Sequence, residues 1–468
     1  MTTQTRIGGA VAADRRPRGW EMGSIRPALA LALSLACLVS AGEARGAELT
    51  LAQAVRSALQ GFPTVEAARA GSDEARAALT EAGAARFPSV RFAGSGSRFE
   101  EPMLVSPIHG FTPSLLPPFD EIVYQTTISL AYPIFDGGGR EARIRVARGR
   151  TQAADAELGG TEQSLMTQVI RAYLETLGFR QVVEAHDLRL EALRAERGRV
   201  SLMRRAGRAA SIDNLRVEAA LAIGEAERMR ATSQLDVAER NLARLAGLAF
   251  DQVHEVPLEP VGLSDSTGVL RDTLLKSAHA LSPAVRQAAA QKSAADAALD
   301  AAQSQRWPEI RLAGGYNGWT HPDGSPTWEW NTSLQMTWSV FDGGAIGGAI
   351  AKARAARHGA DERLRLAALG LDQEVDRALA GLHESQARAR SLSAAVDRFA
   401  EVARIEKLLL ESGSGTQTNY LTVEADLLGA RAGLIEARHA SIAARAELAR
   451  LAGQLGYDWI SQVTEAQP

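Results

Sequence analysis

Cysteine is almost absent from this sequence, since Cys37 is the single one among 468 residues. A disulfide framework and a metal site built from several thiolates are thereby excluded. Aromatic residues make up only 5% of the chain, whereas alanine is abundant. This composition favours long helices that pack closely through small side chains over several separate globular cores. Beyond a short segment near the N-terminus there is no long apolar run, so a membrane location would require strands.

Positive charge is also limited. Beyond residue 46 the chain has 46 basic and 52 acidic residues, so no polybasic surface for nucleic acid is indicated. The eight histidines are scattered, and His383-Glu384 lacks the second histidine that a zinc-protease helix requires. The glycine-rich segment 342–348 fits neither a dinucleotide fingerprint nor a P-loop, and we interpret it as a turn from strand to helix. We therefore predict no enzyme activity, no metal site and no cofactor.

The N-terminus carries an export signal. The apolar segment 27–39 follows a basic region and has the length of a signal-peptide core rather than of a spanning helix. We expect residues 1–46 to be a signal peptide with an N-terminal extension, cleaved after Ala44 or Gly46. Met22 is an alternative start, because the segment before it is unusually long for a signal. Lipidation of Cys37 is not expected, because the residues before it do not form a lipobox.

One later stretch alternates between apolar and polar residues without a break over thirteen positions. One parity carries Trp328, Trp330, Thr332, Leu334, Met336, Trp338 and Val340, and the other carries Glu329, Asn331, Ser333, Gln335, Thr337 and Ser339. A strand with this pattern has one apolar and one polar face. Tryptophans near both ends are typical of the girdles of membrane strands, and eight residues of tilted strand span about 21 Å, close to the apolar band of such a barrel. An edge strand of a soluble sandwich is the alternative.

The sequence contains one design twice. Residues 86–94 (RFPSVRFAG) reappear as residues 306–314 (RWPEIRLAG), an offset of 220. From Phe135-Asp-Gly-Gly138 and Phe341-Asp-Gly-Gly344 onward the offset is 206. The first half therefore has extra length in one connection, from Glu100 to Glu121, whose prolines are expected to prevent regular strand pairing.

Each half is predicted to contain short helices, two strands, a long helix and a shorter returning helix. The first repeat spans residues 48–247, with strands at about 89–99 and 122–134 and helices at 140–206 and 211–246. A linker, 248–267, leads to the second repeat at 268–453, with strands at about 309–320 and 328–341, helices at 345–411 and 416–452, and a tail at 454–468. A helix such as 140–206 would be roughly 100 Å long.

Four strands cannot close a membrane barrel, whose smallest single-chain form has eight. Two chains would give a small barrel filled by its own side chains, whereas three would supply twelve strands and leave room for a lumen. We therefore predict a homotrimer.

These features resemble the TolC family of trimeric outer-membrane efflux and secretion ducts. The resemblance covers about residues 48–453 and rests on the duplicated element order, on Tyr132-Pro-Ile-Phe-Asp-Gly-Gly138 and on Val169-Ile-Arg-Ala-Tyr-Leu174, together with Gly207 and Gly413 before the returning helices. It implies a mainly α protomer that gives four strands to a twelve-stranded outer-membrane β-barrel, continuous with a long periplasmic α-helical barrel. The helix tips would close the far end of the duct.

Three groups of residues are candidate transport features. Glu329, Asn331, Ser333, Gln335 and Thr337 are expected to line the lumen, and Trp328, Trp330, Trp338, Tyr124 and Tyr132 to form the membrane girdle against outer-membrane lipid. The candidates for the periplasmic tip, the gate and the docking of an adaptor are Arg204, Arg205, Gly207, Arg208, Asp213, Gly413, Gly415, Asn419 and Thr422. A solvated strand face and plain helix-hairpin turns are the alternatives.

The gate departs from the best-known member of the family, which places two acidic residues on the inner helix of the second repeat. The matching positions here are Asn419 and Thr422, which leaves Asp213 as the acid near the constriction. Threefold symmetry would bring three copies of Asp213 together, and rings of carboxylates favour cations. A modest cation preference is therefore expected, reduced by the nearby arginines.

Together these observations predict a passive exit duct in the outer membrane of a Gram-negative bacterium, with a large periplasmic extension. Its partners would be a periplasmic membrane-fusion adaptor and an inner-membrane transporter. Within the same class, the outlet of a type I protein-secretion system is the alternative. From another class, a periplasmic coiled-coil adaptor or scaffold would leave the alternation of residues 328–341 unexplained. The sequence does not indicate the cargo.

Overall fold

The structure is a computed structural model that describes residues 48–110, 118–262, 271–321 and 323–465. The predicted signal peptide, its cleavage sites and Cys37 lie outside these residues. So do the middle of the proline-rich connection and the last residues of the predicted tail.

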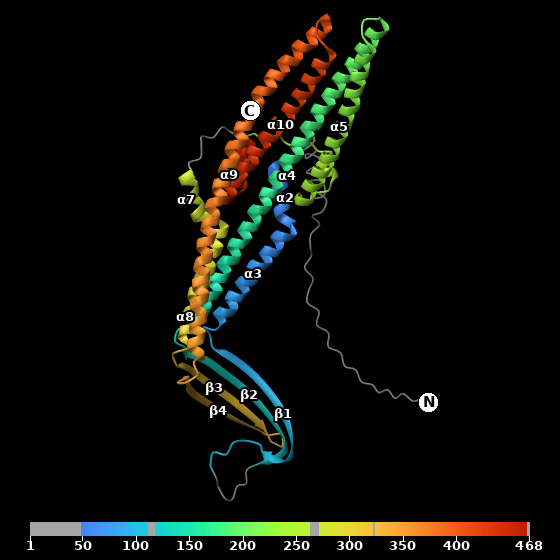
Figure 1. Cartoon of the computed structure of the whole chain (residues 1–468). Coiled ribbons are helices and arrows are strands. Elements are labelled where there is room, and N and C mark those ends of the chain that lie inside the picture. The colour runs from blue at the N-terminus through green and yellow to red at the C-terminus, as the bar shows by residue number, and fades with distance from the viewer. Residues whose placement is uncertain (1–47, 111–117, 263–270, 322, 466–468) are drawn as a thin grey trace, which may run out of the picture. The chain divides into compact units, whose positions relative to one another are not determined.

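The helices and strands follow one another in the same order twice (Figure 1). The first half contains α2 (Leu51–Gly61), α3 (Pro63–Ala84), β1 (Ser89–Leu104), β2 (Phe119–Phe135), α4 (Gly139–Arg205), α5 (Ser211–Ala246) and the single turn α6 (Asp251–His254). The second half contains α7 (Arg271–Leu281), α8 (Pro283–Ser304), β3 (Glu309–Thr320), β4 (Pro326–Thr337), α9 (Ala345–Ser412) and α10 (Gln417–Leu451), and α11 (Tyr457–Glu465) follows it. The mainly helical, internally duplicated protomer predicted from the sequence is confirmed.

Local sequence signals fix where the short helices begin. Thr50 and Gln53 form a capping box at the start of α2, because each side chain accepts a hydrogen bond from the other residue's backbone N–H at 3.1 Å. Pro63 opens α3 and Pro283 opens α8, at a position where a helix has no use for an N–H.

Each long helix begins from an Asp-Gly-Gly turn. The Asp342 carboxylate accepts hydrogen bonds from the N–H groups of Gly344 at 2.9 Å and Ile346 at 2.6 Å, and these bonds lower the pKa of Asp342. Gly344 has φ +94°, a left-handed conformation that a side chain would strain. Asp136 and Gly138 repeat this arrangement at the start of α4. At both helix starts the chain's own aspartate carboxylates therefore occupy free N–H groups. This supports the interpretation of the glycine-rich segments as turns from strand to helix rather than as phosphate-binding loops.

The four strands form one antiparallel sheet in the order β1-β2-β3-β4, seen side by side in Figure 1. β1–β2 and β3–β4 are hairpins from the two repeats, and the pairing of β2 with β3 joins them. In the described protomer β1 and β4 are therefore edge strands, each with one side that has no partner.

Both strands of the first repeat are longer than predicted, since β1 extends to Leu104 and β2 begins at Phe119, beyond the predicted limits 99 and 122. The prediction that the prolines of this connection prevent pairing is wrong at Pro102. The register shifts between Arg98 and Met103, and pairing then resumes up to Leu104 opposite Phe119. The proline lies in that irregularity, where the missing N–H is tolerated.

β4 differs from its prediction at both ends, because it begins at Pro326 and stops at Thr337 rather than near residue 341. Thr337 pairs with Glu309, the first residue of β3. The next residue of β4 would lie opposite Pro308, which cannot donate a backbone hydrogen bond. Trp338 instead donates its indole N–H to the Arg306 carbonyl at 3.1 Å as the chain leaves the sheet.

α4 packs against more elements than any other helix, since it contacts α2, α3, α5, α8 and α10. It approaches α8 closely at Gly149, where an added Cβ would lie 2.9 Å from the backbone nitrogen of Ala294. α9 packs against α10 and α8. The bounds of α4, α9 and α10 differ from the predicted ones by one residue, which is within the usual fraying of helix ends.

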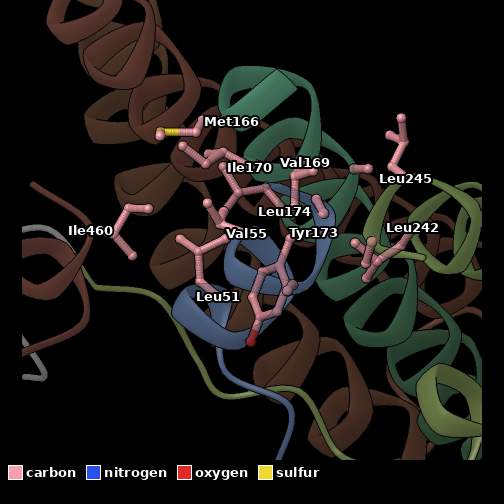
Figure 2. Packing of buried hydrophobic residues seen from close by; sticks show 14 of the residues in the cluster. Leu51, Val55, Met166, Val169, Ile170, Tyr173, Leu174, Leu242, Leu245 and Ile460 are labelled. Carbon is pink, nitrogen blue, oxygen red and sulfur yellow. The ribbon is translucent and has the colours of Figure 1, made fainter. Parts of the chain in front are cut away.

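The largest hydrophobic core lies around the middle of α4, where α2, α5, α10 and α11 meet it. Figure 2 shows Leu51, Val55, Ile170, Tyr173 and Leu242 gathered in this cluster. The Tyr173 hydroxyl lies 2.7 Å from the Leu49 carbonyl and 2.8 Å from the Glu259 carbonyl, so it joins the start of the first repeat to the linker. In the described part of the chain, no helix has both the length and the apolar character needed to cross a membrane.

Candidate functional site

The predicted lumen-lining residues share one face of β4. Their partners in β3 are Asn317 for Glu329, Gly315 for Asn331, Ala313 for Ser333, Arg311 for Gln335 and Glu309 for Thr337. Because directly opposed residues of an antiparallel pair point to the same side, this face continues across the sheet.

The same face is polar on all four strands. The Thr127 hydroxyl of β2 lies 3.0 Å from the Asn317 side-chain oxygen of β3, and Arg91 of β1 occupies the row that ends at Asn331. Arg91 and Arg311 were not among the residues predicted from the sequence. Their strands alternate as β4 does, but glycines interrupt the apolar parity of β1 and β3 and weaken the signal.

Glu329 differs from the other predicted lumen-lining residues because its side chain meets a histidine from another connection. Its carboxylate lies 2.8 Å from His109 Nε2, in the connection between β1 and β2, and only 25% of the Glu329 side chain is exposed. His109, which follows β1 in the chain, therefore lies beside the edge strand β4.

The other face of the sheet is apolar and exposed. Val90 and Phe92 of β1, Tyr316 of β3, and Trp330 and Leu334 of β4 lie on it, and 75% of Trp330 and 67% of Leu334 are exposed. A contiguous apolar surface of this kind marks contact with a partner or with lipid rather than with water. Alternation of an apolar face and a polar face is the pattern of a membrane barrel strand.

The predicted girdle residues lie in two groups along the apolar face. Trp328 stacks on Tyr316 with ring centroids 5.1 Å apart, and Trp328, Trp330 and Tyr124 lie toward the β3–β4 turn. Tyr132 and Trp338 lie toward the helices, where the Arg140 guanidinium is 6.0 Å from the Tyr132 ring centroid. Two aromatic groups separated along the strands match the two interfaces of a membrane.

The tip of the first repeat is a tight turn between α4 and α5. α4 ends with Arg204 and Arg205, Gly207 has φ +71°, and the Arg208 N–H donates to the Met203 carbonyl at 2.8 Å. Asp213 lies in the first turn of α5, and its carboxylate is 3.7 Å from Arg216.

The tip of the second repeat turns through Gly413, which has φ +78°. Gly415 lies so close to α9 that an added Cβ would be 2.9 Å from the Leu410 backbone nitrogen, so only glycine fits there. The Thr416 hydroxyl caps α10 by accepting the Asn419 N–H at 3.2 Å, and the Thr422 hydroxyl donates to the Thr418 carbonyl at 2.9 Å. Among the described residues, no hydrogen bond or ion pair joins Asn419 or Thr422 to the first repeat, so their role at the gate stays a prediction.

The two tips meet along a cleft of about 490 Å³. Of the predicted tip residues, Arg208, Asp213, Gly413 and Gly415 line it, whereas Arg204, Arg205, Gly207, Asn419 and Thr422 do not. Arg199, Arg216 and Glu411 also line the cleft and were missed, because the sequence cannot show which helix faces oppose each other. Three arginines and two carboxylates thus share it.

Tyr420 joins the repeats just behind this cleft and was also missed. Only 5% of Tyr420 is exposed, and burial together with the nearby carboxylates of Glu424 and Glu196 raises its pKa. Arg199 beside it forms a two-pronged ion pair with Glu196 at 2.6 and 2.8 Å. In the described ranges, no three histidine, cysteine or acidic side chains gather in a way that would hold a metal ion.

Comparison with known proteins agrees with this geometry. The family described as outer membrane efflux protein matches residues 54–248 and 274–454. Protein CyaE of Bordetella pertussis is 28% identical over 343 residues, which cover 70% of this chain and 70% of that protein.

Solved structures show the same fold. The outer membrane protein VceC of Vibrio cholerae is 19% identical and has a TM-score of 0.72, covering 86% of this chain and 96% of VceC. The outer membrane channel CmeC of Campylobacter jejuni is 15% identical and has a TM-score of 0.73, covering 86% of each chain. At these identities the likeness establishes the fold alone.

Proposed function

The chain belongs to the outer membrane efflux protein family, and we propose on this basis that three copies form the exit duct of a tripartite efflux system. The protein is an outer-membrane channel of a Gram-negative bacterium with a helical periplasmic extension, as the sequence predicted. In the proposed assembly an inner-membrane transporter and a periplasmic adaptor deliver substrate. The duct conducts it passively.

The single observation that carries this proposal is the form of the sheet. Four strands with an exposed apolar face and two unpartnered edges cannot be stable alone in either water or lipid. Closing the edges β4 to β1 between neighbouring copies satisfies every backbone group. Three copies give twelve strands, with the apolar face toward lipid and the polar face around a lumen.

In this assembly the water-filled lumen is lined by Asn331, Ser333, Gln335 and Thr337. Glu329 also faces the lumen, where it is paired with His109. The tip cleft is the proposed gate, because opening the duct requires the two hairpins of a protomer to move relative to their neighbours. The same tips are the proposed docking site of the adaptor, and Arg204 and Arg205 are the proposed contact residues on the first hairpin.

Three experiments in sequence test the proposal. Membrane fractionation is expected to place the protein in the outer membrane as a trimer, and the purified trimer is expected to conduct ions across a planar bilayer. A soluble periplasmic protein without conductance would instead be the coiled-coil scaffold considered above. Export of small dyes and of a secreted protein, compared in cells with and without the gene, then separates an efflux duct from the outlet of a protein-secretion system.

A further inference from the structure

A second cavity lies where the polar face of the sheet meets the starts of the long helices. Its volume is about 820 Å³. Arg91 and Arg311 reach it from β1 and β3, and Arg140 and Arg143 reach it from the first turns of α4. Asp136, Glu309 and Asp342 are the acids that line it, so the lining carries one more positive than negative charge.

The three acidic residues of the cavity already have hydrogen-bond or ion-pair partners within the chain. Asp342 caps α9 by accepting two backbone N–H bonds, at 2.9 and 2.6 Å. Asp136 caps α4 in the same way and is 3.4 Å from Arg143. Glu309 is paired with Arg311 at 2.6 Å. The two helix starts therefore take most of the carboxylate oxygens of Asp136 and Asp342, and among the described residues the guanidinium groups of Arg91 and Arg140 have no acidic partner.

Two of these arginines have N–H donors without an acceptor among the described residues. The Arg91 guanidinium makes no hydrogen bond or ion pair with any described residue, although it is exposed on the polar face. Arg140 donates Nη1–H to the Pro133 carbonyl at 2.8 Å, but its Nε–H is buried without a partner among the described residues. A buried N–H without an acceptor is unfavourable. The exposed Arg91 guanidinium is the group that is open to an anion entering the cavity.

We propose that this cavity is a subsite for oxyanions, which takes inorganic phosphate or the carboxylate or phosphate group of an acidic cargo. The inference rests on the proposed function, because the cavity belongs to the lumen only when three copies close the barrel. The planar guanidinium fork of Arg91 matches an oxyanion, and the hydroxyls of Ser89, Ser129 and Thr337 line the same cavity. Three copies make a ring of positive charge, the arrangement that favours anions in pores.

The chain offers a matched control for Arg91. Arg98 lies on the same strand with the opposite parity, so its side chain belongs to the lipid-side face, opposite Ile122. The Arg98 side chain is 77% exposed, and its guanidinium lies 3.8 Å from the Glu121 carboxylate. Arg91→Gln and Arg98→Gln therefore remove the same charge from opposite faces of one strand.

The experiment measures the block of trimer current in a planar bilayer by inorganic phosphate and, separately, by benzoate. Arg91→Gln is expected to weaken the block by phosphate about fivefold or more, and Arg98→Gln to leave it unchanged. Block by phosphate alone would indicate a site for free inorganic anions, and block by both probes a site that also accepts the acidic group of an organic cargo. Equal block of wild type and both variants would overturn the subsite.

A failure of the subsite proposal can be distinguished from a failure of the proposed function. If the wild-type trimer carries no current, the duct proposal fails, and calorimetric titration of phosphate into the detergent-solubilised protein still decides the subsite. Heat of binding that is lost in Arg91→Gln and kept in Arg98→Gln supports it. No binding by the wild-type protein rejects it.

Discussion

Leu334 and Ser333 are neighbours in β4 with opposite surroundings, because Leu334 lies on the apolar face and Ser333 on the polar face. Leu334→Lys is expected to reduce the amount of trimer in the outer membrane strongly. A lysine on the lipid face near the bilayer centre costs about 2–4 kcal/mol, whereas one in a lumen stays hydrated. The measurement is trimer yield in outer-membrane fractions, with Ser333→Lys as the control. Equal yields would show that the proposed parity is wrong.

His439 of α10 is held neutral in a groove against α4. Burial first, and the neighbouring Arg438 second, lower its pKa to about 4. An added Cβ on Gly178 of α4 would lie 2.9 Å from His439 Nδ1, which shows how closely the ring is packed. Arg171, Glu175 and Glu436 are the charged groups that line the same groove.

A lowered folded-state pKa means that the unfolded chain takes up a proton first as the pH falls. The stability contributed by neutral His439 is therefore fully present above pH 6.5 and is lost between about pH 6.5 and 4, by about 3 kcal/mol at most. Thermal unfolding of the wild-type trimer is expected to drop over this range. In His439→Gln this part of the pH dependence should disappear. An unchanged profile would mean that the imidazole is solvated.

At the scale of single residues, the alternation of apolar and polar residues predicted the placement of side chains better than closeness to a turn did. Alternation placed Glu329 to Thr337 on one polar face because the period of a strand is fixed by its backbone. It could not find Arg91 or the neutral state of His439, since both depend on which element lies opposite. Arg204 was selected because it lies at a predicted turn, and Asn419 because it matches a gate position of the resembling family. Neither criterion shows which side chains enter the cleft.

At the scale of elements, a glycine lets α4 approach α8 closely at one point of their contact. Gly149→Ala would place a methyl group 2.9 Å from the backbone nitrogen of Ala294, so the helices must separate. The expected loss is about 1–3 kcal/mol. Gly159→Ala in the same helix meets nothing within 4 Å and should stabilise the protein by about 1 kcal/mol through helix propensity. Thermal unfolding of the two variants tests this, and a Gly149→Ala protein as stable as wild type would contradict it.

Element ends were the least predictable part of the fold, and the reasons are specific. β4 stops at Thr337 because its partner strand begins after Pro308, a fact that appears only once the register of β3 and β4 is known. β1 continues past Pro102 because an irregularity absorbs the proline. By contrast, the capping box at Thr50 and the Asp-Gly-Gly turns act through the nearest few residues, so the sequence alone contains the information.

At the scale of the whole molecule, two charge rings would act in opposite directions in a trimeric duct. Asp213 at the tip favours cations, although Arg216 at 3.7 Å and the arginines of the cleft reduce its effect. Asp213→Asn is expected to lower the cation preference modestly, and Arg91→Gln to raise it. The measurement is reversal potential across a planar bilayer under a salt gradient. If Asp213→Asn and wild type give identical values, Asp213 does not face the pore.

The duplication was visible from the sequence because repeats need no structure to be recognised, whereas closure between copies is a property that one chain cannot show by itself. It can be tested at the two open edges. In one protomer β2 and β3 separate β1 from β4, so their backbones are about 14 Å apart and no disulfide can form between them. In a closed trimer β4 of one copy lies beside β1 of the next, with opposed Cα atoms about 4.5–5.5 Å apart.

Ala93→Cys in β1 is therefore combined, one at a time, with a cysteine at each polar-face position of β4, which are Glu329, Asn331, Ser333, Gln335 and Thr337. At least one combination is expected to give a covalent trimer on a non-reducing gel after oxidation of intact outer membranes. Phe92→Cys with the same partners is the control, because Phe92 lies on the apolar face and opposed residues must share a face. Covalent trimers from Ala93→Cys but not from Phe92→Cys require that the edges pair and that the polar face turns inward as one surface. Outer-membrane protein that stays monomeric in every combination would exclude closure through β1 and β4, and with it the lumen through which the duct is proposed to conduct.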